Sequence, residues 1–362
     1  MDISCRKVVQ SEPFFSICIP VYNPGVDFLK CLASIAKQDM SDYEVVIVDD
    51  GSNPAVDIEA YARDSGLDLK KIISFRIPNG GPYNARLVLA NHACGSIIVT
   101  MDADDEFIDS RVLSRLYEAH RNGDPDMVLY NATRSLDDPE PLIDYGKLDC
   151  KNGWVDLQQF LTEFVGSYEF NSLWSKSIKR SLVSADGSAQ PVRLLMGEDR
   201  LRTLDYLDSI STIKLLDEPL YYYRESELSI TSARYRYESA LEIISVETKL
   251  WSKLPSYRVE ESVWANCYLH TLFNILVALD NNNDYSIRDH LIQFEEIAQK
   301  PITITASSYI SHSDERLSNK IALKLLFTGQ YVLLCAYLKI RSNAVFLYKS
   351  GKRLVSKIKR VR

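Results

Sequence analysis

Residues 96–106 read SIIVTMDADDE, and they join two opposite kinds of sequence. The first half has the continuous apolar character of a strand buried on both faces of a sheet. The second half places four acidic residues within five positions, namely Asp102, Asp104, Asp105 and Glu106. Like charges at that density repel one another unless a cation lies among them or water surrounds them. The segment therefore predicts either a metal site or a solvated loop at the end of a buried strand.

The spacing of the acids favours the metal site. In an extended segment Asp102 and Asp104 point to the same side, because side chains alternate with a period of two. Ligands that are all oxygen favour Mg²⁺ or Mn²⁺. In the alternative interpretation the acids cap a following helix, for which Asp109 is the expected N-cap. Capping uses one or two acids and does not need four.

The first third of the chain alternates apolar strands with amphipathic helices. This alternation predicts an α/β fold with a parallel sheet covered by helices on both faces. Ligands of such sheets bind at the carboxyl ends of the strands, where the acidic stretches VDDGS and MDADDE occur. The expected strands are 14–20, 44–50, 71–77, 96–102 and 126–132, and the expected helices are 27–38, 55–65, 81–93 and 109–121.

The remainder of the chain changes character twice. Residues 133–232 are mixed, with helices expected at 156–165 and 197–208. From residue 233 the pattern is helical, with helices expected at 234–254, 260–280, 287–299 and 317–340. We therefore expect two halves of one α/β domain, 1–132 and 133–232, followed by a helical C-terminal region, 233–362.

Composition and motifs exclude several classes of protein. The 362 residues are 46% hydrophobic and 25% charged, as in ordinary globular proteins. The seven cysteines form no CxxC pair, so we expect reduced thiols and no structural zinc. The five histidines show no ligand-like spacing, and neither GxGxxG nor GxxxxGK[ST] occurs. The first 15 residues lack the apolar core of a signal peptide.

Charge is distributed unevenly along the chain. The net charge is −7, yet residues 316–362 carry twelve Lys and Arg and no Asp or Glu. The rest of the chain therefore carries −19. Cations interleaved with apolar residues at the C-terminus are typical of a segment that lies on an anionic membrane surface. The alternative is a helix packed on the acidic body, and nucleic-acid binding is disfavoured by that acidity and the lack of a reader motif.

Three further stretches hold candidate site residues, each with a plainer alternative. In VDDGS (48–52) a carboxylate can contact a base or ribose, or form an Asx turn. In GED (197–199) a carboxylate can deprotonate an acceptor hydroxyl, or interact only with the helix dipole. In EPLYYYR (218–224) Arg224 can reach a phosphate, or the run is an edge strand with a loop.

Taken in order, these motifs resemble those of the family 2 glycosyltransferases, which have the GT-A fold. The resemblance covers residues 14–232 and rests on seven motifs at suitable spacing. They are PVYN (20–23), the second-strand pattern 44–52, NGG with a following AR (79–81 and 85–86), DADD (102–105), NSLWSKSIKRSLV (171–183), GED (197–199) and 219–231.

The resemblance implies an inverting transfer of sugar from a nucleotide-diphosphate sugar, with UDP the commonest nucleotide, and a role for each motif. Asp104 is expected to ligate Mg²⁺ or Mn²⁺, and Asp102 to contact the ribose or a metal-bound water. Asp199 is expected to be the catalytic base, with Glu198 as the alternative. The residues expected at the nucleotide sugar are Pro20, Tyr22, Asn23, Asp50 (at the base), Asn79, Arg86, Asp102, Ala103 and Arg224.

Two positions depart from the family pattern. Many relatives have His where this chain has Ser226, and there Arg224 is the substitute expected near the diphosphate. Many also have Pro where this chain has Asp109, which changes only how the next helix is capped.

The resemblance, together with the basic C-terminus, implies a transferase for surface polysaccharide, peripheral on the inner face of the cell membrane, acting on a glycan or lipid-linked acceptor. The alternatives are a sugar-nucleotide nucleotidyltransferase, which is expected to show a Gly-rich loop after the first strand that is missing here, and a silent glycan-binding scaffold.

Overall fold

The computed structural model describes residues 12–183, 194, 196–225, 236–282 and 284–343. The chain divides into two compact units, residues 1–231 and 232–362.

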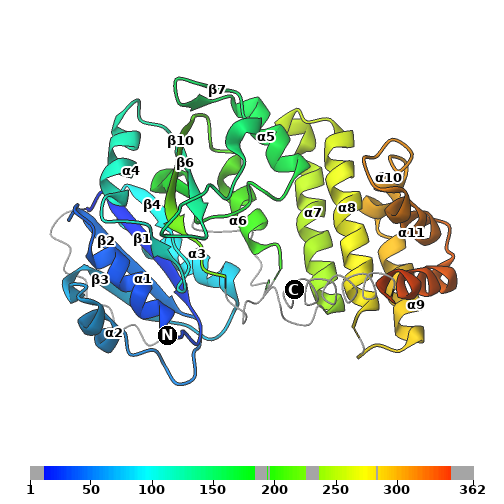
Figure 1. The fold of residues 1–362 in the computed structure, drawn as a ribbon, viewed down its shortest axis with the longest axis horizontal. Coiled ribbons are helices and arrows are strands. Elements are labelled where there is room, and N and C mark those ends of the chain that lie inside the picture. The colour runs from blue at the N-terminus through cyan, green and yellow to red at the C-terminus, as the bar shows by residue number, and fades with distance from the viewer. Residues whose placement is uncertain (1–11, 184–193, 195, 226–235, 283, 344–362) are drawn as a thin grey trace, which may run out of the picture. The chain divides into compact units, whose positions relative to one another are not determined.

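A ten-stranded mixed sheet forms the centre of the first unit (Figure 1). Its order is β3-β2-β1-β4-β9-β6-β10-β8-β7, with β5 paired to β10. The first four strands in this order are mutually parallel, whereas β9 lies antiparallel between β4 and β6. The strands are β1 (Phe15–Val21), β2 (Tyr43–Asp49), β3 (Ile72–Arg76), β4 (Ile97–Thr100), β5 (Glu106–Phe107), β6 (Met127–Thr133), β7 (Cys150–Lys151), β8 (Trp154–Val155), β9 (Lys176–Lys179) and β10 (Ile213–Tyr222).

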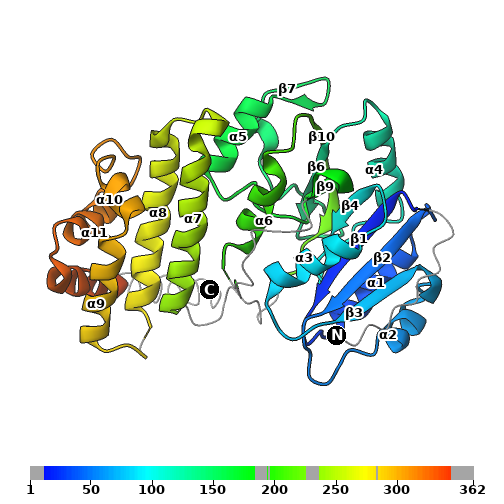
Figure 2. The same cartoon turned by 180° about the vertical axis from the view of Figure 1, so that it is seen from behind.

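Helices cover both faces of this sheet, as predicted (Figures 1 and 2). Successive side chains of β1 enter different cores: Ile17 joins the core under α1 (Asp27–Ala36), α2 (Ile58–Ser65) and α4 (Val112–Arg121). Cys18 joins the core under α3 (Pro82–His92). Because the strand is buried on both sides, the period of two is hidden in a continuous apolar run. Short 3₁₀ turns occur at Leu69–Lys71, Tyr145–Lys147 and Arg180–Leu182.

The predicted cap of α4 is wrong. The helix begins at Val112, and its N-cap residue is Arg111, which makes no side-chain cap. Asp109 lies outside the helix, where its carboxylate accepts a hydrogen bond from the Arg111 amide at 2.7 Å and pairs with Arg115. The carboxylate therefore closes the turn that precedes the helix and does not satisfy the helix's own amides.

The interpretation of 218–224 as an edge strand is also wrong. These residues end β10, which pairs with β6 on one side and with β8 and β5 on the other. Two register shifts flank Pro219, which has no amide to donate to the ladder. The other helices of this unit, α5 (Leu157–Gly166) and α6 (Glu198–Leu207), lie where they were predicted.

The second unit is helical, as predicted. Its helices are α7 (Tyr237–Tyr257), α8 (Glu261–Asp280), α9 (Ile287–Ala298), α10 (Pro301–Ser307), α11 (Leu317–Phe327) and residues 331–343. The expected helix 317–340 is broken, because Gly329 adopts a φ of +70°. The short helix α10 was not predicted.

Helix α8 is the centre of this unit. Its side chains Trp264, Tyr268 and Leu272 are fully buried. By length and composition alone it is apolar enough to cross a membrane, the one such helix among the described residues. More than half of it is buried against other parts of the chain, as in the core helix of a globular unit.

Candidate active site

Asp50, at the end of β2, holds the loop that leads into α3. Its two carboxylate oxygens accept hydrogen bonds from the amides of Gly80 at 2.7 Å and Gly81 at 2.9 Å. Asn79 donates from its side chain to the Asp50 carbonyl at 3.0 Å. Gly51 has a φ of +78°, and a Cβ there would lie 2.7 Å from the Asn79 nitrogen. The turn therefore needs glycine, and Asp50 and Asn79 lie together as one rigid corner.

The loop after β1 is joined to the same corner. Pro20 pairs with Val48 in the parallel register of β1 and β2. The Asn23 amide donates to Ser52 Oγ at 2.8 Å, and its side-chain oxygen accepts from Asn53 at 2.9 Å. Tyr22 is 54% exposed beside this junction. An exposed aromatic ring on a fixed loop at the strand ends is available to contact a ligand.

The acidic turn after β4 separates into two pairs of carboxylates. Asp105 is buried and accepts a hydrogen bond from the Arg224 amide at 2.8 Å, and Glu106 pairs with the Arg224 guanidinium. Asp102 and Asp104 are more exposed. Ala103, between them, packs against the core. Asp105 and Glu106 therefore hold the turn, whereas Asp102 and Asp104 lie on its more exposed side.

Burial and neighbouring negative charge raise the pKa of two carboxyl groups in this turn. Burial, together with the charge of Asp102, raises the pKa of Asp104, and the same two causes raise the pKa of Asp105 to about 8. The Asp102 amide donates to the Tyr221 hydroxyl at 2.9 Å. The crowding predicted from the sequence is therefore present, and a cation at Asp102 and Asp104 would relieve it.

Arg224 contacts the acidic turn along its length. Its Nε donates to the Asp104 carbonyl at 3.1 Å and lies 3.4 Å from the Asp27 carboxylate. The expected phosphate contact of Arg224 stays a prediction, but its observed role is to hold the turn. Ser226, the departure from the family pattern, lies outside the described residues.

Arg86 of α3 joins the donor side of the site to the expected base. It is 8% exposed. One guanidinium nitrogen lies 3.0 Å from Asp102 Oδ1, and the other lies 3.1 Å from Asp199 Oδ1 and 3.7 Å from Glu198 Oε1. Burial opposes its charge, but the three carboxylates outweigh burial and raise its pKa. A single buried cation thus links three of the predicted site residues.

Asp199 and Glu198 form the first turn of α6, after Gly197 at a φ of +80°. Burial raises the pKa of both carboxyl groups, and Arg86 acts against this rise. Their neighbour Arg200 is fully buried and donates to the carbonyls of Phe164, Val165 and Ser167 at 2.8–3.0 Å. Because those carbonyls belong to the end of α5, Arg200 fixes the start of α6 and with it both carboxylates.

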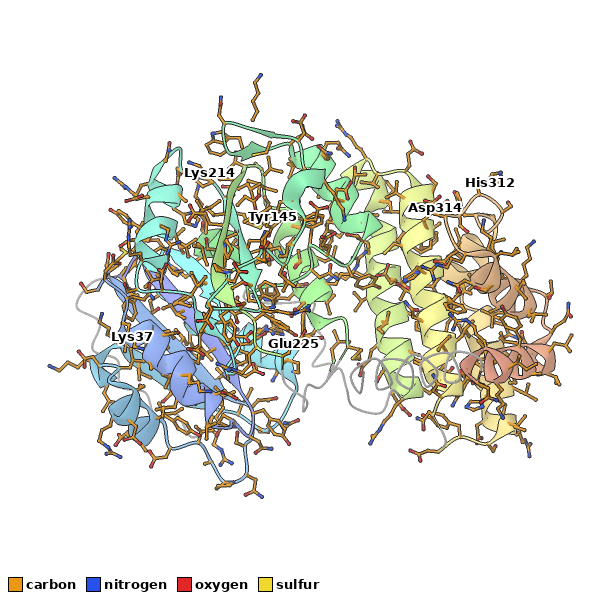
Figure 3. All side chains as sticks on the ribbon, in the orientation of Figure 1. Lys37, Tyr145, Lys214, Glu225, His312 and Asp314 are labelled. Atoms are coloured by element: carbon orange, nitrogen blue, oxygen red, sulfur yellow. The ribbon has the colours of Figure 1, made fainter. Side chains whose placement is uncertain are left out.

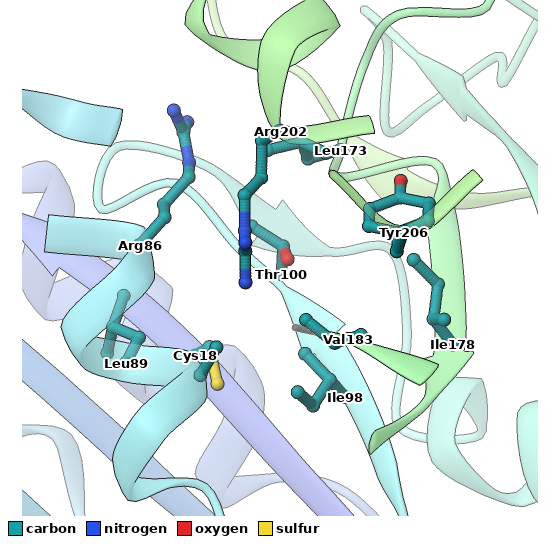
Figure 4. Close-up of a pocket in the computed structure, with 11 residues that line it drawn as sticks. Cys18, Arg86, Leu89, Ile98, Thr100, Leu173, Ile178, Val183, Arg202 and Tyr206 are labelled. Atoms are coloured by element: carbon teal, nitrogen blue, oxygen red, sulfur yellow. The ribbon is translucent and has the colours of Figure 1, made fainter. Parts of the chain in front are cut away.

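A small cavity lies beside Arg86, between α3, β4, β9 and α6 (Figure 4). Arg202 of α6 reaches toward its centre, and apolar side chains form most of the wall, including Leu89, Ile98 and Ile178. Arg86, which pairs with Asp102 and Asp199, is one of the residues that line this cavity.

No histidine is part of this constellation. His120 lies 2.8 Å from Ser177 Oγ, His92 stacks on Phe75, and His270 pairs with Glu315. His312 lies on the exposed turn between α10 and α11 (Figure 3). The six cysteines among the described residues are all free thiols.

The part of the chain that holds the donor side of this site matches a known protein family. Residues 16–159 match the model of glycosyl transferase family 2. Over these residues the chain resembles the family 2 glycosyltransferases.

Two relatives and one solved structure show how far the likeness extends. The chain is 25% identical over 229 residues to the uncharacterized glycosyltransferase EpsJ of Bacillus subtilis, covering 62% of this chain and 64% of EpsJ. It is 29% identical over 131 residues to the amylovoran biosynthesis glycosyltransferase AmsB of Erwinia amylovora, covering 34% of this chain and 42% of AmsB. The chain thus spans less than two thirds of the length of these relatives.

The likeness in fold extends further. The structure of S. aureus TarS 1–349 in complex with UDP superposes with a TM-score of 0.60, at 15% identity, over 91% of each chain. The fold is therefore that of the GT-A glycosyltransferases with a C-terminal helical extension.

The family match ends before Asp199. It includes Asp50, Arg86, Asp102 and Asp104, whereas the base side of the site rests on the geometry around α6. All of these residues were predicted from the sequence, with Arg86 expected at the nucleotide sugar. The pairing of Arg86 with Asp102, Glu198 and Asp199 was not predicted. Tyr221 and Lys176 were also missed. The only signal for Tyr221 was its place in the motif LYYYR, and the only signal for Lys176 was its place in NSLWSKSIKRSLV.

Proposed function

We propose that the chain transfers a sugar from a nucleotide-diphosphate sugar to a hydroxyl of a glycan or lipid-linked acceptor, with inversion at the anomeric carbon. The observation that carries this proposal is the ion-pair junction of Asp102, Arg86 and Asp199. The Arg86 guanidinium contacts both Asp102, the carboxylate expected at the donor, and Asp199, the carboxylate expected to act as the base. A scaffold protein has no use for a carboxylate that a buried arginine holds at the start of α6.

The protein's part in the reaction is proton removal and positioning. Asp199 accepts the proton of the acceptor hydroxyl while the oxygen bonds to the anomeric carbon. The bond from that carbon to the diphosphate oxygen breaks, and the nucleoside diphosphate leaves with the electron pair. A single displacement from the opposite side inverts the carbon. Glu198, at the same helix end, is the alternative base.

Asp104 and Asp102 fit a divalent cation in part. Both offer oxygen donors, and burial with mutual repulsion raises the pKa of Asp104. Among the described residues no group of three or more acidic, His or Cys side chains forms a complete cage. The remaining ligands would therefore be water and diphosphate oxygens. When bound, Mg²⁺ or Mn²⁺ supplies charge stabilisation for the leaving diphosphate.

Titration calorimetry with UDP, GDP and their common sugar conjugates tests this proposal, in the presence and absence of Mn²⁺. We expect one nucleotide to bind in a metal-dependent way. Asp104→Ala is expected to weaken that binding by at least the roughly 10- to 100-fold that loss of an outer-shell partner costs a metal site. We propose a uridine nucleotide, the donor that the family resemblance favours. A folded protein that binds no nucleotide with metal present would contradict the proposal.

The acceptor class follows the relatives' names. AmsB is named for the biosynthesis of amylovoran, and we propose that this chain likewise extends a surface polysaccharide such as a capsule or O-antigen. We propose that the donor sugar and the linkage depend on the shape of the pocket in residues 133–232 and on the helical C-terminal region.

We place the enzyme at the inner face of the cell membrane, held by its C-terminal region. On α11 and residues 331–343 several large apolar side chains are at least 39% exposed: Leu317, Ile321, Val332, Leu333 and Ile340. Lys320 and Lys324 share the helical face of Leu317 and Ile321 by spacing. Exposed apolar residues mixed with cations fit the interface of an anionic bilayer.

Removal of residues 344–362 tests this placement. The segment holds seven Lys and Arg, and each cation near an anionic surface contributes about 1 kcal/mol. We expect partition onto phosphatidylglycerol vesicles to fall by more than about 100-fold, with neutral phosphatidylcholine vesicles as the control. Unchanged partition would instead favour a tail that packs on the acidic part of the chain.

A further inference from the structure

One buried cation near the base has no place in the mechanism above. Lys176, the first residue of β9, is 1% exposed, although lysine is almost never fully buried without a partner. Its ammonium donates to the carbonyl of Phe170 at 2.7 Å and to that of Ser172. Burial lowers its pKa to about 7, and the negative charge of Asp199 opposes that decrease.

The ammonium holds a turn that faces the expected base. Between its second acceptor and Lys176 lies Leu173, whose backbone amide faces the Asp199 carboxylate and lowers its pKa. The same turn is tied to α6 at Asn171, whose side-chain oxygen accepts from Arg200 at 3.2 Å and whose carbonyl accepts from Thr203 at 3.5 Å. The position of the Leu173 amide therefore depends on the buried ammonium.

We propose that Lys176 is a positioning residue for the catalytic base: it fixes the 170–173 turn against Asp199 and supplies a second positive charge to that carboxylate. This inference rests on the proposed function, because it assigns the residue to the base of that reaction. The groups that face Asp199 are then Arg86 of α3, Asp102 after β4, Glu198 of α6, Lys176 of β9 and the Leu173 amide.

Two variants separate the effect of the Lys176 charge from the effect of its hydrogen bonds to the Phe170 and Ser172 carbonyls. Lys176→Gln keeps two N–H donors for the Phe170 and Ser172 carbonyls but removes the charge. Lys176→Met removes both. Lys179→Met is the matched control, because Lys179 ends the same strand yet pairs with Asp124 and Asp126 at 2.9 and 3.3 Å.

The primary measurement is the titration of Asp199 by carbon NMR of protein labelled at the aspartate carboxyl, with Asp199→Asn to assign the signal. A nearby cation lowers a carboxyl pKa by about 1–3 units. We therefore expect the midpoint of Asp199 to rise by about one pH unit in both Lys176 variants and to stay unchanged in Lys179→Met. This readout needs no turnover, so it decides the role of Lys176 even if no sugar nucleotide is a substrate.

The pH profile of kcat is the second measurement. Its acidic limb is expected to move upward by the same amount, because the base must be deprotonated to act. At high pH we expect Lys176→Gln to approach the wild-type rate, whereas Lys176→Met stays slow because the turn is released. KM for the donor is expected to be unchanged.

An Asp199 midpoint that does not move in a folded Lys176→Gln protein would overturn the proposal, as would an equal shift in Lys179→Met. A wild-type protein that is inactive with every sugar nucleotide would overturn the proposed function alone.

Discussion

Asp199→Asn is expected to lower kcat by about 10²–10⁴-fold, the usual contribution of a positioned general base. Asparagine matches the volume of aspartate, and the Asp199 backbone carbonyl still accepts from Thr203 Oγ1 at 2.9 Å, so the start of α6 is preserved. Arg86 retains Asp102 and Glu198 as partners. Donor affinity, measured by calorimetry, should change little compared with kcat, because the lost group acts on the acceptor's proton.

The pH profile gives the same variant a second test. Burial raises the pKa of Asp199, so wild-type activity is expected to fall as the pH decreases through that raised value. The acidic limb should vanish in Asp199→Asn. Because Asp199 and Glu198 lie side by side and both pKa values are raised, the limb belongs to the pair. Glu198→Gln is the matched variant, and Asp199→Asn with undiminished turnover would move the base assignment to Glu198 or refute it.

The sequence predicts which segments are strands far better than it predicts how those strands pair. The buried parallel strands β1 to β4 are continuous apolar runs, and their helices have clear amphipathic spacing. Strand β9 was not predicted, because its sequence KSIK is only four residues long and two of these are lysine. Its insertion between β4 and β6 is a long-range pairing that no local pattern encodes.

Two helix boundaries were predicted wrongly, and in each case a single residue determines the boundary. A single periodic pattern runs through residues 317–340, but the positive φ at Gly329 ends the helix there. Asp109 has the right identity for an N-cap, yet it closes the turn before α4. Both errors concern boundaries, which depend on one dihedral angle or one hydrogen bond and not on the periodicity that defines the element.

The candidate site was predictable residue by residue but not in its connections. The acids at 102 and 104 stand out because a continuous apolar run ends there in crowded like charge, and those at 198 and 199 stand out through the GED motif. The charge that connects them does not, because Arg86 lies in a helix whose sequence has only a weak apolar face. Lys176 was hidden for the same reason: a lysine in a short segment is typical of a surface, and only the fold shows it buried.

Arg86→Met is expected to be the most destabilising single substitution at this site. Methionine fills similar space without charge, and it leaves Asp102, Glu198 and Asp199 without their shared cation. Removing one partner of a buried ion pair costs about 3–5 kcal/mol of unfolding free energy, because the remaining charge is uncompensated. Arg202→Met is the matched control: Arg202 is a buried arginine on the facing helix that pairs with Asp205 at 3.5 Å. We expect its loss to cost less, because Asp205 keeps the hydrogen bond from the Tyr83 hydroxyl at 2.6 Å.

The pH dependence of the Arg86→Met loss follows from the direction of the carboxyl shifts. Burial raises the pKa of Asp199 and Glu198, and Arg86 limits that rise, so the variant's folded-state values are higher still. A carboxyl with a raised folded pKa binds its proton more tightly in the folded state, so stability decreases as the pH rises through the interval between the unfolded and folded values. Urea unfolding should therefore show a small deficit near pH 4 that grows toward pH 8. A deficit that is equal at both pH values would mean that Arg86 stabilises the fold by packing alone, and that the three carboxylates do not share its charge.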